Sequence, residues 1–144
     1  MKVQTFSYHT QSVPGFHYFL VPLCFVTLLA SVANGVVSII RGETIIVPVL
    51  LISLALIATI TVFFLRSFVC KVQDRVIRTE ENFRYFVLTG KLLESRLTIG
   101  QIIALRFAPD DEFPDLCEKA FQKNMSPDDI KRSIQKWKAD NYRV

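Results

Sequence analysis

The sequence predicts an all-α membrane protein, in which a hairpin of two transmembrane helices precedes a helical tail. Three observations predict this fold class. Residues 15–40 contain no Asp, Glu, Lys or Arg, residues 44–65 form a second uncharged run, and 15 of the 17 basic and 12 of the 13 acidic residues lie between 66 and 144. A membrane-spanning helix needs roughly 20 apolar residues, which both runs supply. The expected organisation is therefore an arm over 1–14, a hairpin over 15–65 and a cytoplasmic helical domain over 66–144.

The N-terminal arm, residues 1–14, is polar and aromatic and shows no helical period. Together with Tyr8, the aromatic residues Phe16 and Tyr18 are typical of the belt that forms where a protein crosses the membrane interface. His9 and His17 leave open a metal or proton site, although histidines at a membrane interface without such a role are commoner. We therefore expect an interfacial arm.

The first span is expected over about residues 15–40. A cleavable signal peptide is the competing interpretation, because Ser31-Val32-Ala33 offers small residues at the spacing of a cleavage site. Only Lys2 provides positive charge ahead of the apolar run, and that run continues past the site to Ile40. We therefore favour a span.

Polar and small side chains recur along the first span at intervals of three and four residues, which places them on one helix face. These residues are Thr27, Ser31, Asn34, Gly35 and Ser38. Small residues let transmembrane helices approach closely, so we expect this face to pack against Ala55, Ala58 and Thr59 of the second span. The alternative is that the face lines a water-filled path in an oligomer.

The second span is expected over about residues 45–65. The uncharged run contains fifteen Leu, Ile, Val or Phe residues, and these favour membrane insertion by roughly 5 to 9 kcal/mol in total. A topology signal follows at once in the basic residues Arg66, Lys71, Arg75 and Arg78, whereas the connecting turn has only Arg41, offset by Glu43. Because basic residues remain on the cytoplasmic side, both termini are expected there, with the cluster against anionic lipid.

Beyond the membrane, the second helix is expected to continue to a C-cap near Gly90. Apolar residues keep a helical spacing along this segment, at Val69, Val72, Val76, Phe83, Phe86 and Val87. We expect the last four of these to be buried against the tail.

Three shorter helices are expected in the tail. The first begins at Thr98, where Gln101 completes a capping box, and it runs towards Pro109. The second begins within residues 110–114, and the third opens at Ser126 with Pro127 at its first helical position. The candidate tail core consists of their large apolar residues, which are Phe107, Phe113, Phe121, Ile130, Ile134 and Trp137.

The motifs of several functional classes are missing from the sequence. No CxxC spacing, glycine-rich phosphate loop or GxSxG occurs, and the tail after residue 65 has no histidine, so we expect no catalytic residues, metal site or cofactor. The acidic residues at 110–112 and 115 are usual at a helix start and lack the EF-hand spacing. Basic and acidic residues alternate in the tail, so we expect no nucleic-acid binding.

The tail resembles a family of small bacterial two-span membrane proteins of uncharacterised function. The resemblance lies in NFRYFVLTGK at 82–91, LTIGQIIALRFA at 97–108 and SPDDIKRSIQKWKADNYRV at 126–144. It covers about residues 74–144, and the spans match only in their arrangement. The resemblance implies this fold and a location in the bacterial inner membrane, and it carries over no site residues.

The expected function is that of a membrane-anchored interaction module, scaffold or accessory subunit. The last three helices occupy only about 55 residues, which is marginal for an isolated fold. Contact with the long helix, a second copy or another membrane protein would complete the core. The alternative is a homo-oligomeric channel or transport component, in which the polar face of the first span lines a path.

Overall fold

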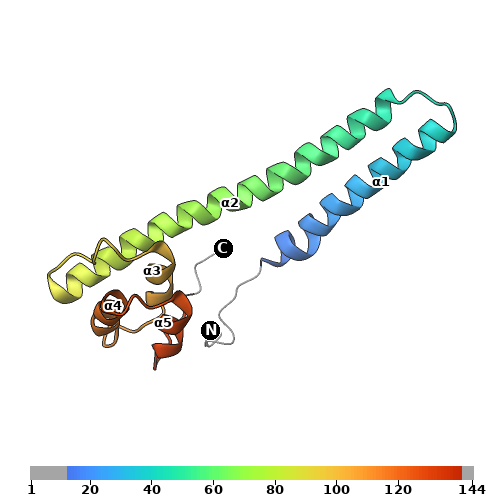
Figure 1. The fold of residues 1–144 in the computed structure, drawn as a ribbon. Coiled ribbons are helices and arrows are strands. Elements are labelled where there is room, and N and C mark those ends of the chain that lie inside the picture. Colours follow the sequence, from blue (N-terminus) through green and yellow to red (C-terminus); the bar gives the residue numbers. More distant parts are fainter. Residues whose placement is uncertain (1–12, 141–144) are drawn as a thin grey trace. The chain divides into compact units, whose positions relative to one another are not determined.

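The computed structural model describes residues 13–140, and every regular element among them is helical (Figure 1). A short π-helical segment and five α-helices follow one another along the chain. They are η2 (Gly15–Leu20), α1 (Val21–Ile40), α2 (Ile46–Thr89), α3 (Ile99–Leu105), α4 (Phe113–Gln122) and α5 (Pro127–Ser133). The chain divides into two compact units, one containing the hairpin up to residue 69 and the other beginning at Cys70. The expected interfacial residues 1–12, with Tyr8 and His9, lie outside the described part.

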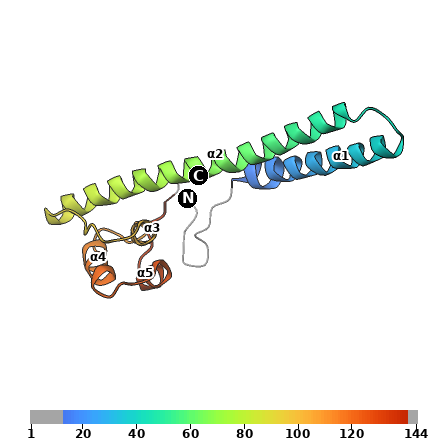
Figure 2. The same ribbon diagram turned by 45° about the horizontal axis from the view of Figure 1, so that its top comes forward.

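The hairpin consists of η2 and α1 running antiparallel to the first part of α2 (Figures 1 and 2). The turn between them includes Gly42, whose φ of +67° is a backbone conformation that glycine adopts without strain. Pro22 lies in the first turn of α1 and Pro48 in the first turn of α2. At those positions proline removes no hydrogen bond within the helix, so neither residue kinks its helix.

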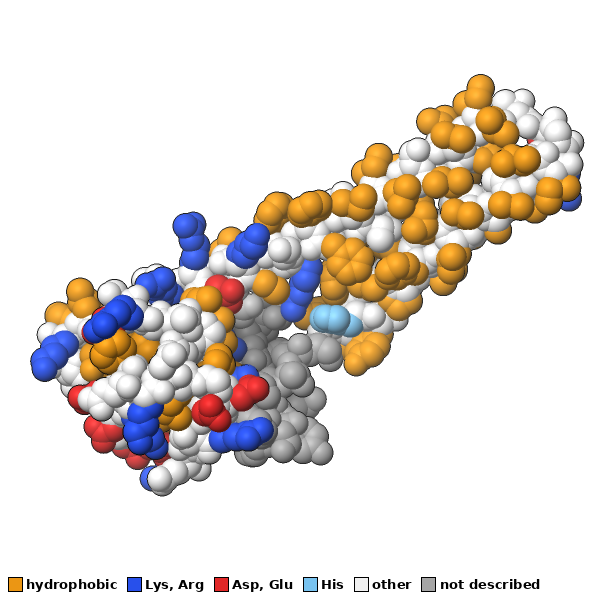
Figure 3. All heavy atoms as spheres, viewed as in Figure 1, with side chains coloured by type: hydrophobic (Ala, Val, Ile, Leu, Met, Phe, Trp, Pro, Cys, Tyr) orange, Lys and Arg blue, Asp and Glu red, His pale blue; other side chains and the backbone are white. Residues whose placement is uncertain are grey.

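Both hairpin helices are long and apolar enough to cross a membrane. Only 11% of the most apolar window of η2–α1 and 17% of that of α2 is buried, whereas the core helix of a soluble protein would be mostly buried. Hydrophobic side chains cover the visible face of the hairpin, and charged ones gather over the tail (Figure 3). The hairpin therefore presents to its surroundings a surface suited to lipid.

Helix α2 continues for 44 residues, well beyond the apolar window. It ends at Gly90, whose φ is +71° and whose amide donates to the carbonyl of Phe86 at 2.8 Å. A left-handed glycine after the last turn is a common way to end a helix. The predicted long helix and its glycine cap are both present.

The tail helices begin at the predicted caps. In α3, the Thr98 hydroxyl accepts from the Gln101 amide, and the Gln101 side chain accepts from the Thr98 amide at 2.8 Å, which completes the capping box. The Gln101 side-chain amide also donates to the Met125 carbonyl at 2.8 Å. In α5, the Ser126 hydroxyl accepts from the Asp129 amide. The cap of α3 thus also ties it to the segment that leads into α5.

The last helix is shorter than its apolar spacing suggested. It ends at Ser133, and Ile134 has the extended backbone angles φ −72° and ψ +120°. The next two amides, of Gln135 and Lys136, donate to the two carboxylate oxygens of Glu112 at 3.0 and 3.1 Å. Trp137 therefore lies beyond α5, in an extended segment rather than on a helix face.

The tail core lies where α3, α4 and α5 meet. Of the six predicted core residues, Phe107, Phe113, Ile130 and Ile134 are buried, whereas Phe121 and Trp137 are partly buried and pack against the cluster. The Trp137 ring stacks on that of Phe107, with 5.0 Å between the centroids. Ile77 of α2 belongs to the same cluster, so the long helix contributes to the core.

Candidate functional site

The close contact inside the hairpin is formed by part of the predicted polar face. Ser31, Gly35 and Ser38 of α1 are buried. A Cβ atom added at Gly35 would lie 3.4 Å from Cδ1 of Ile52 and 3.6 Å from Cβ of Pro48. The two helices thus meet at van der Waals distance along a seam of small residues, as the packing interpretation expected.

The remainder of that face is not part of the seam. Thr27 and Asn34 are exposed, and on α2 it is Ala55 and Thr59 that are buried, whereas Ala58 is exposed. The buried hydroxyls bond within their own helices, since Ser31 donates to the Thr27 carbonyl and Thr59 to the Ala55 carbonyl, both at 2.8 Å. Asn34 therefore presents its amide to the outside of the hairpin.

The predicted topology residues follow the second span. Arg66 places its guanidinium carbon 5.7 Å from the centroid of the Phe16 ring. Lys71, Arg75 and Arg78 are exposed, and none of them forms an ion pair within residues 13–140. They are thus placed for contact with lipid headgroups or with another protein.

Arg84 joins α2 to the tail. Its guanidinium donates to Asp110 at 2.7 Å, to the Ala108 carbonyl at 2.7 Å and to Glu81 at 3.0 Å. The side chain is only 13% exposed. The expected pairing with Glu80, four residues earlier, is replaced by one with Glu81, because position 81 faces the tail.

The carboxylates around Arg84 have opposite electrostatic environments. Burial raises the pKa of Glu81, although the hydrogen bond and charge of Arg84 act against the shift. The hydrogen bond from Arg84 lowers the pKa of Asp110, which is exposed. The attachment of α2 to the tail therefore depends on one arginine that neutralises a buried acid and an exposed one.

A row of apolar side chains on α2 is exposed, contrary to the prediction that it is buried against the tail. Val76, Phe83, Phe86 and Val87 are 49, 68, 49 and 66% exposed. The face that contacts the tail carries Ile77 and Glu81, both buried, together with the partly buried Arg84 and Tyr85. Apolar residues alone did not identify the contact face, since two of these four side chains are charged. We name as the outer stripe the residues Val72, Val76, Thr79, Phe83 and Phe86.

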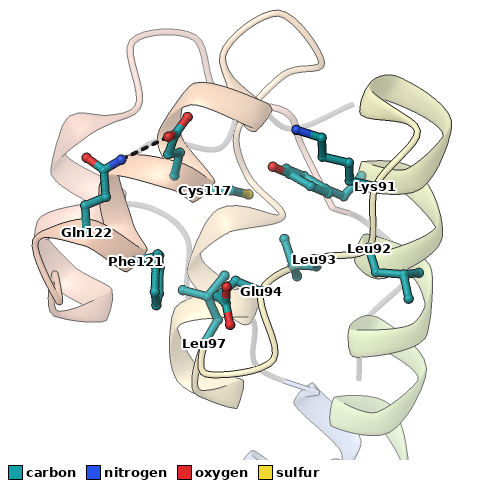
Figure 4. Close-up of a pocket in the computed structure, with 10 residues that line it drawn as sticks. Lys91, Leu92, Leu93, Glu94, Leu97, Cys117, Phe121 and Gln122 are labelled. Atoms are coloured by element: carbon teal, nitrogen blue, oxygen red, sulfur yellow. Dashed lines mark hydrogen bonds between the residues drawn. The ribbon is translucent and has the colours of Figure 1, made fainter.

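A cavity of about 320 Å³ lies between the end of α2, the following loop and α4 (Figure 4). Its lining includes Tyr85, Leu93 and Phe121, with Lys91 at its margin and Cys117 at its floor. Burial raises the pKa of the Cys117 thiol to about 12, so the thiolate that would act as a nucleophile is scarce. The cavity therefore provides apolar contact rather than an activated group.

Among residues 13–140, no three His, Cys, Asp or Glu residues are grouped so as to hold a metal ion. The outer stripe is therefore the most prominent candidate site in the described part of the chain. Sequence reasoning found its residues but not their exposure. The signal that could have found it is their 4-3-4-3 spacing, which marks one continuous face of a helix.

Comparisons with known proteins complete the description. No curated protein and no solved structure matches the chain. A model described as a family of unknown function (DUF6526) matches residues 1–144, which is the whole chain. The chain therefore belongs to this family of unknown function.

Proposed function

We propose that the protein is a membrane-anchored interaction module, acting as a scaffold or accessory subunit in the bacterial inner membrane. The observation that carries the proposal is the outer stripe of α2, where Phe83 and Val72 are 68 and 61% exposed in a segment outside the apolar spans. Large apolar side chains that gather on one exposed face mark a protein or membrane interaction site. The hairpin anchors this face near the bilayer, and the tail holds the helix that carries it.

The proposed orientation places both termini in the cytoplasm. Arg66, Lys71 and Arg75 follow the second span, whereas the turn has only Arg41, whose guanidinium lies 3.9 Å from the Glu43 carboxylate. This excess of positive charge is the usual mark of the cytoplasmic side. The outer stripe and the tail would then face cytoplasmic partners and the inner leaflet.

Binding rather than catalysis is the proposed mode of action. The cavity beside α4 has a protonated thiol, because burial holds the pKa of Cys117 at about 12, and apolar side chains over much of its lining. The acids of the tail serve the fold, since Glu112 binds two backbone amides and Asp110 pairs with Arg84. These roles leave the outer stripe as the surface free for a partner.

The experiment compares the full-length protein with Phe83→Asp in native membranes solubilised with mild detergent. We expect wild-type assemblies, sized by native electrophoresis, to be larger than one chain and to be lost in the variant. The matched control is Leu92→Asp, because Leu92 is 70% exposed but lies outside the stripe. Assemblies that survive Phe83→Asp, or that are lost equally in Leu92→Asp, would refute the proposed interaction surface.

A homo-oligomeric channel or transport component remains the second candidate, because the amide of Asn34 is exposed on the outside of the hairpin. If several hairpins gather around that side chain, Asn34→Leu would place an apolar constriction in the path and block ions by dewetting. The measurement is ion flux into liposomes that contain the wild type or Asn34→Leu. Wild-type flux that the substitution abolishes would support the channel; flux equal to that of empty liposomes would exclude it.

A further inference from the structure

The outer stripe has the spacing of a coiled-coil seam. Its residues follow one another at intervals of 4, 3, 4 and 3, so Val76 and Phe83 occupy the first apolar position of a heptad and Val72, Thr79 and Phe86 the second. This repeat keeps one face of a helix against a parallel partner helix over several turns. A single flat partner or a lipid surface would accept a broader face and requires no such repeat.

The tail leaves this seam unobstructed. At 100° per residue, Ile77, Glu81, Arg84 and Tyr85 lie on the opposite side of α2 from the stripe, and these residues are buried or partly buried in the contact with the tail. A second helix can therefore pack against α2 without displacing α3, α4 or α5 from it.

Charges beside the seam select the partner. Arg75 and Glu80 occupy the two positions that flank a coiled-coil seam, and both are exposed, with no ion pair within residues 13–140. In a parallel pair, a residue at the first flanking position lies across from the residue five places further along the other helix. Arg75 of each copy would then meet Glu80 of the other, and two-fold symmetry forms the pair twice.

The membrane supplies the parallel orientation. In any two copies inserted in one bilayer, the segment after residue 66 leaves the apolar span with the same chain direction. Two outer stripes can therefore meet in register without a large rearrangement. We infer that the occupant of the outer stripe is the outer stripe of a second copy, in a parallel α2–α2 coiled coil; this inference rests on the proposed function and names its partner.

Crosslinking tests the seam in native membranes. The parent carries Cys24→Ala and Cys70→Ala and retains Cys117, which is 2% exposed. Val76→Cys and Thr79→Cys in this parent should give disulfide-linked dimers on mild oxidation. Arg78→Cys, at an exposed position on the other side of the helix, and the parent itself should remain monomeric. No dimer at 76 and 79, or as much dimer at 78, would overturn the inference.

A charge exchange tests the register. Arg75→Glu and Glu80→Arg each replace two attractive pairs by two repulsive ones, so each should weaken dimerisation of full-length protein about two- to thirty-fold. The double variant restores complementarity and should return within about three-fold of the wild type. Energy transfer between labelled copies in lipid nanodiscs measures the equilibrium, and the emission of Trp137 checks that the tail remains folded. A double variant as weak as the two single changes combined would overturn the pairing.

Failure of this inference can be distinguished from failure of the proposed function. If Phe83→Asp dissolves native assemblies but Val76→Cys gives no dimer, the stripe binds a different protein, so the interaction module stands and the coiled coil fails. If a fluorophore at residue 83 is quenched by nitroxide-labelled lipid and does not transfer energy to a second copy, the stripe lies on the bilayer and the coiled coil fails too. If Phe83→Asp has no effect on the assemblies, the proposed function itself fails.

Discussion

The guanidinium carbon of Arg84 lies 4.1 Å from the centroid of the Phe113 ring, which is fully buried. The same side chain bonds Asp110 and the carbonyl of Ala108. One arginine on α2 thus combines a cation–π contact with directional hydrogen bonds to the tail. The junction depends on the planar shape of the guanidinium as well as on its charge.

Replacing Arg84 should therefore destabilise the tail strongly. Arg84→Ala leaves Glu81 buried without its partner, and we expect the free energy of unfolding to fall by about 3 to 5 kcal/mol. Arg84→Lys should recover only part of the loss, because lysine cannot form the same set of bonds. Urea unfolding in detergent, followed by fluorescence of the single tryptophan, measures the change. Arg96→Ala is the control, since that side chain is 73% exposed; an equal loss there would contradict the assignment.

The ionisation of Glu81 should make the tail less stable as pH rises. Burial raises the pKa of Glu81 above its ordinary 4.5 in the folded protein, so above pH 4.5 the folded state binds more protons than the unfolded one. The free energy of unfolding therefore falls as pH rises through this window. Asp110 acts only at lower pH, because its pKa lies below the ordinary 3.8.

Glu81→Gln isolates this effect. Between pH 7 and 4.5, we expect the wild type to gain stability relative to Glu81→Gln as the pH falls, since only the wild type can take up the proton. The same urea titration, repeated at several pH values, measures the gap. A gap that stays constant or moves the other way would show that Glu81 has an unshifted or lowered pKa.

Truncating Trp137 should cost less than truncating a fully buried aromatic residue. Its ring stacks on Phe107 but is only partly buried, so we expect Trp137→Ala to lower the free energy of unfolding by about 2 to 3 kcal/mol. Pulse proteolysis of the tail replaces fluorescence as the measurement, because the variant has no tryptophan. Leu92→Ala serves as the control, and a loss well under 1 kcal/mol for Trp137→Ala would place that ring on the surface.

Cysteine reactivity should differ sharply between the tail and the helix that leads to it. With a pKa of about 12, Cys117 is ionised in roughly one molecule in ten thousand at pH 8. A maleimide should therefore label Cys117 at least about a hundred times more slowly than the partly exposed Cys70. Variants that retain one cysteine each separate the two rates, and urea should release the block on Cys117. Fast labelling of Cys117 without urea would show that the floor of the cavity opens.

The orientation can be tested with single cysteines. Glu43→Cys, in the turn, should react with a membrane-impermeant maleimide on intact cells, whereas Lys136→Cys should react only after lysis. Position 43 is preferable to Gly42, because the φ of +67° at that glycine would strain any side chain placed there. Labelling of Lys136→Cys in intact cells would invert the proposed topology.

Local signals in the sequence predicted the helices well, since composition, caps and glycine act over a few residues. The capping box of Thr98 and Gln101 and the glycine end of α2 are examples. Contacts distant along the chain could not be predicted in this way. The end of α5 is set by Glu112, which binds the amides of Gln135 and Lys136 from 23 and 24 residues away.

The face of α2 that meets the tail shows the same limit. Hydrophobic spacing favoured Phe83 and Phe86, yet the contact is made through Arg84, whose suitability depends on Phe113 and Asp110. A charged residue in a contact has no distinctive pattern in one sequence, because it resembles any solvated arginine until its partners are placed. The polar face of α1 was predicted in part for a similar reason, since spacing alone does not separate the buried Ser31 from the exposed Asn34.

The extended segment after α5 has a consequence at the level of the gene. A stop codon in place of the one for Ile134 would remove only eleven of the 144 residues. The shortened protein would nevertheless lack both amides that bind Glu112, the amide of Lys138 that donates to the Phe107 carbonyl at 2.8 Å, and the ring that covers Phe107. Nonsense and frameshift alleles near the end of the reading frame should therefore behave as losses of the whole tail, whereas missense alleles at exposed sites such as Lys123 should be silent.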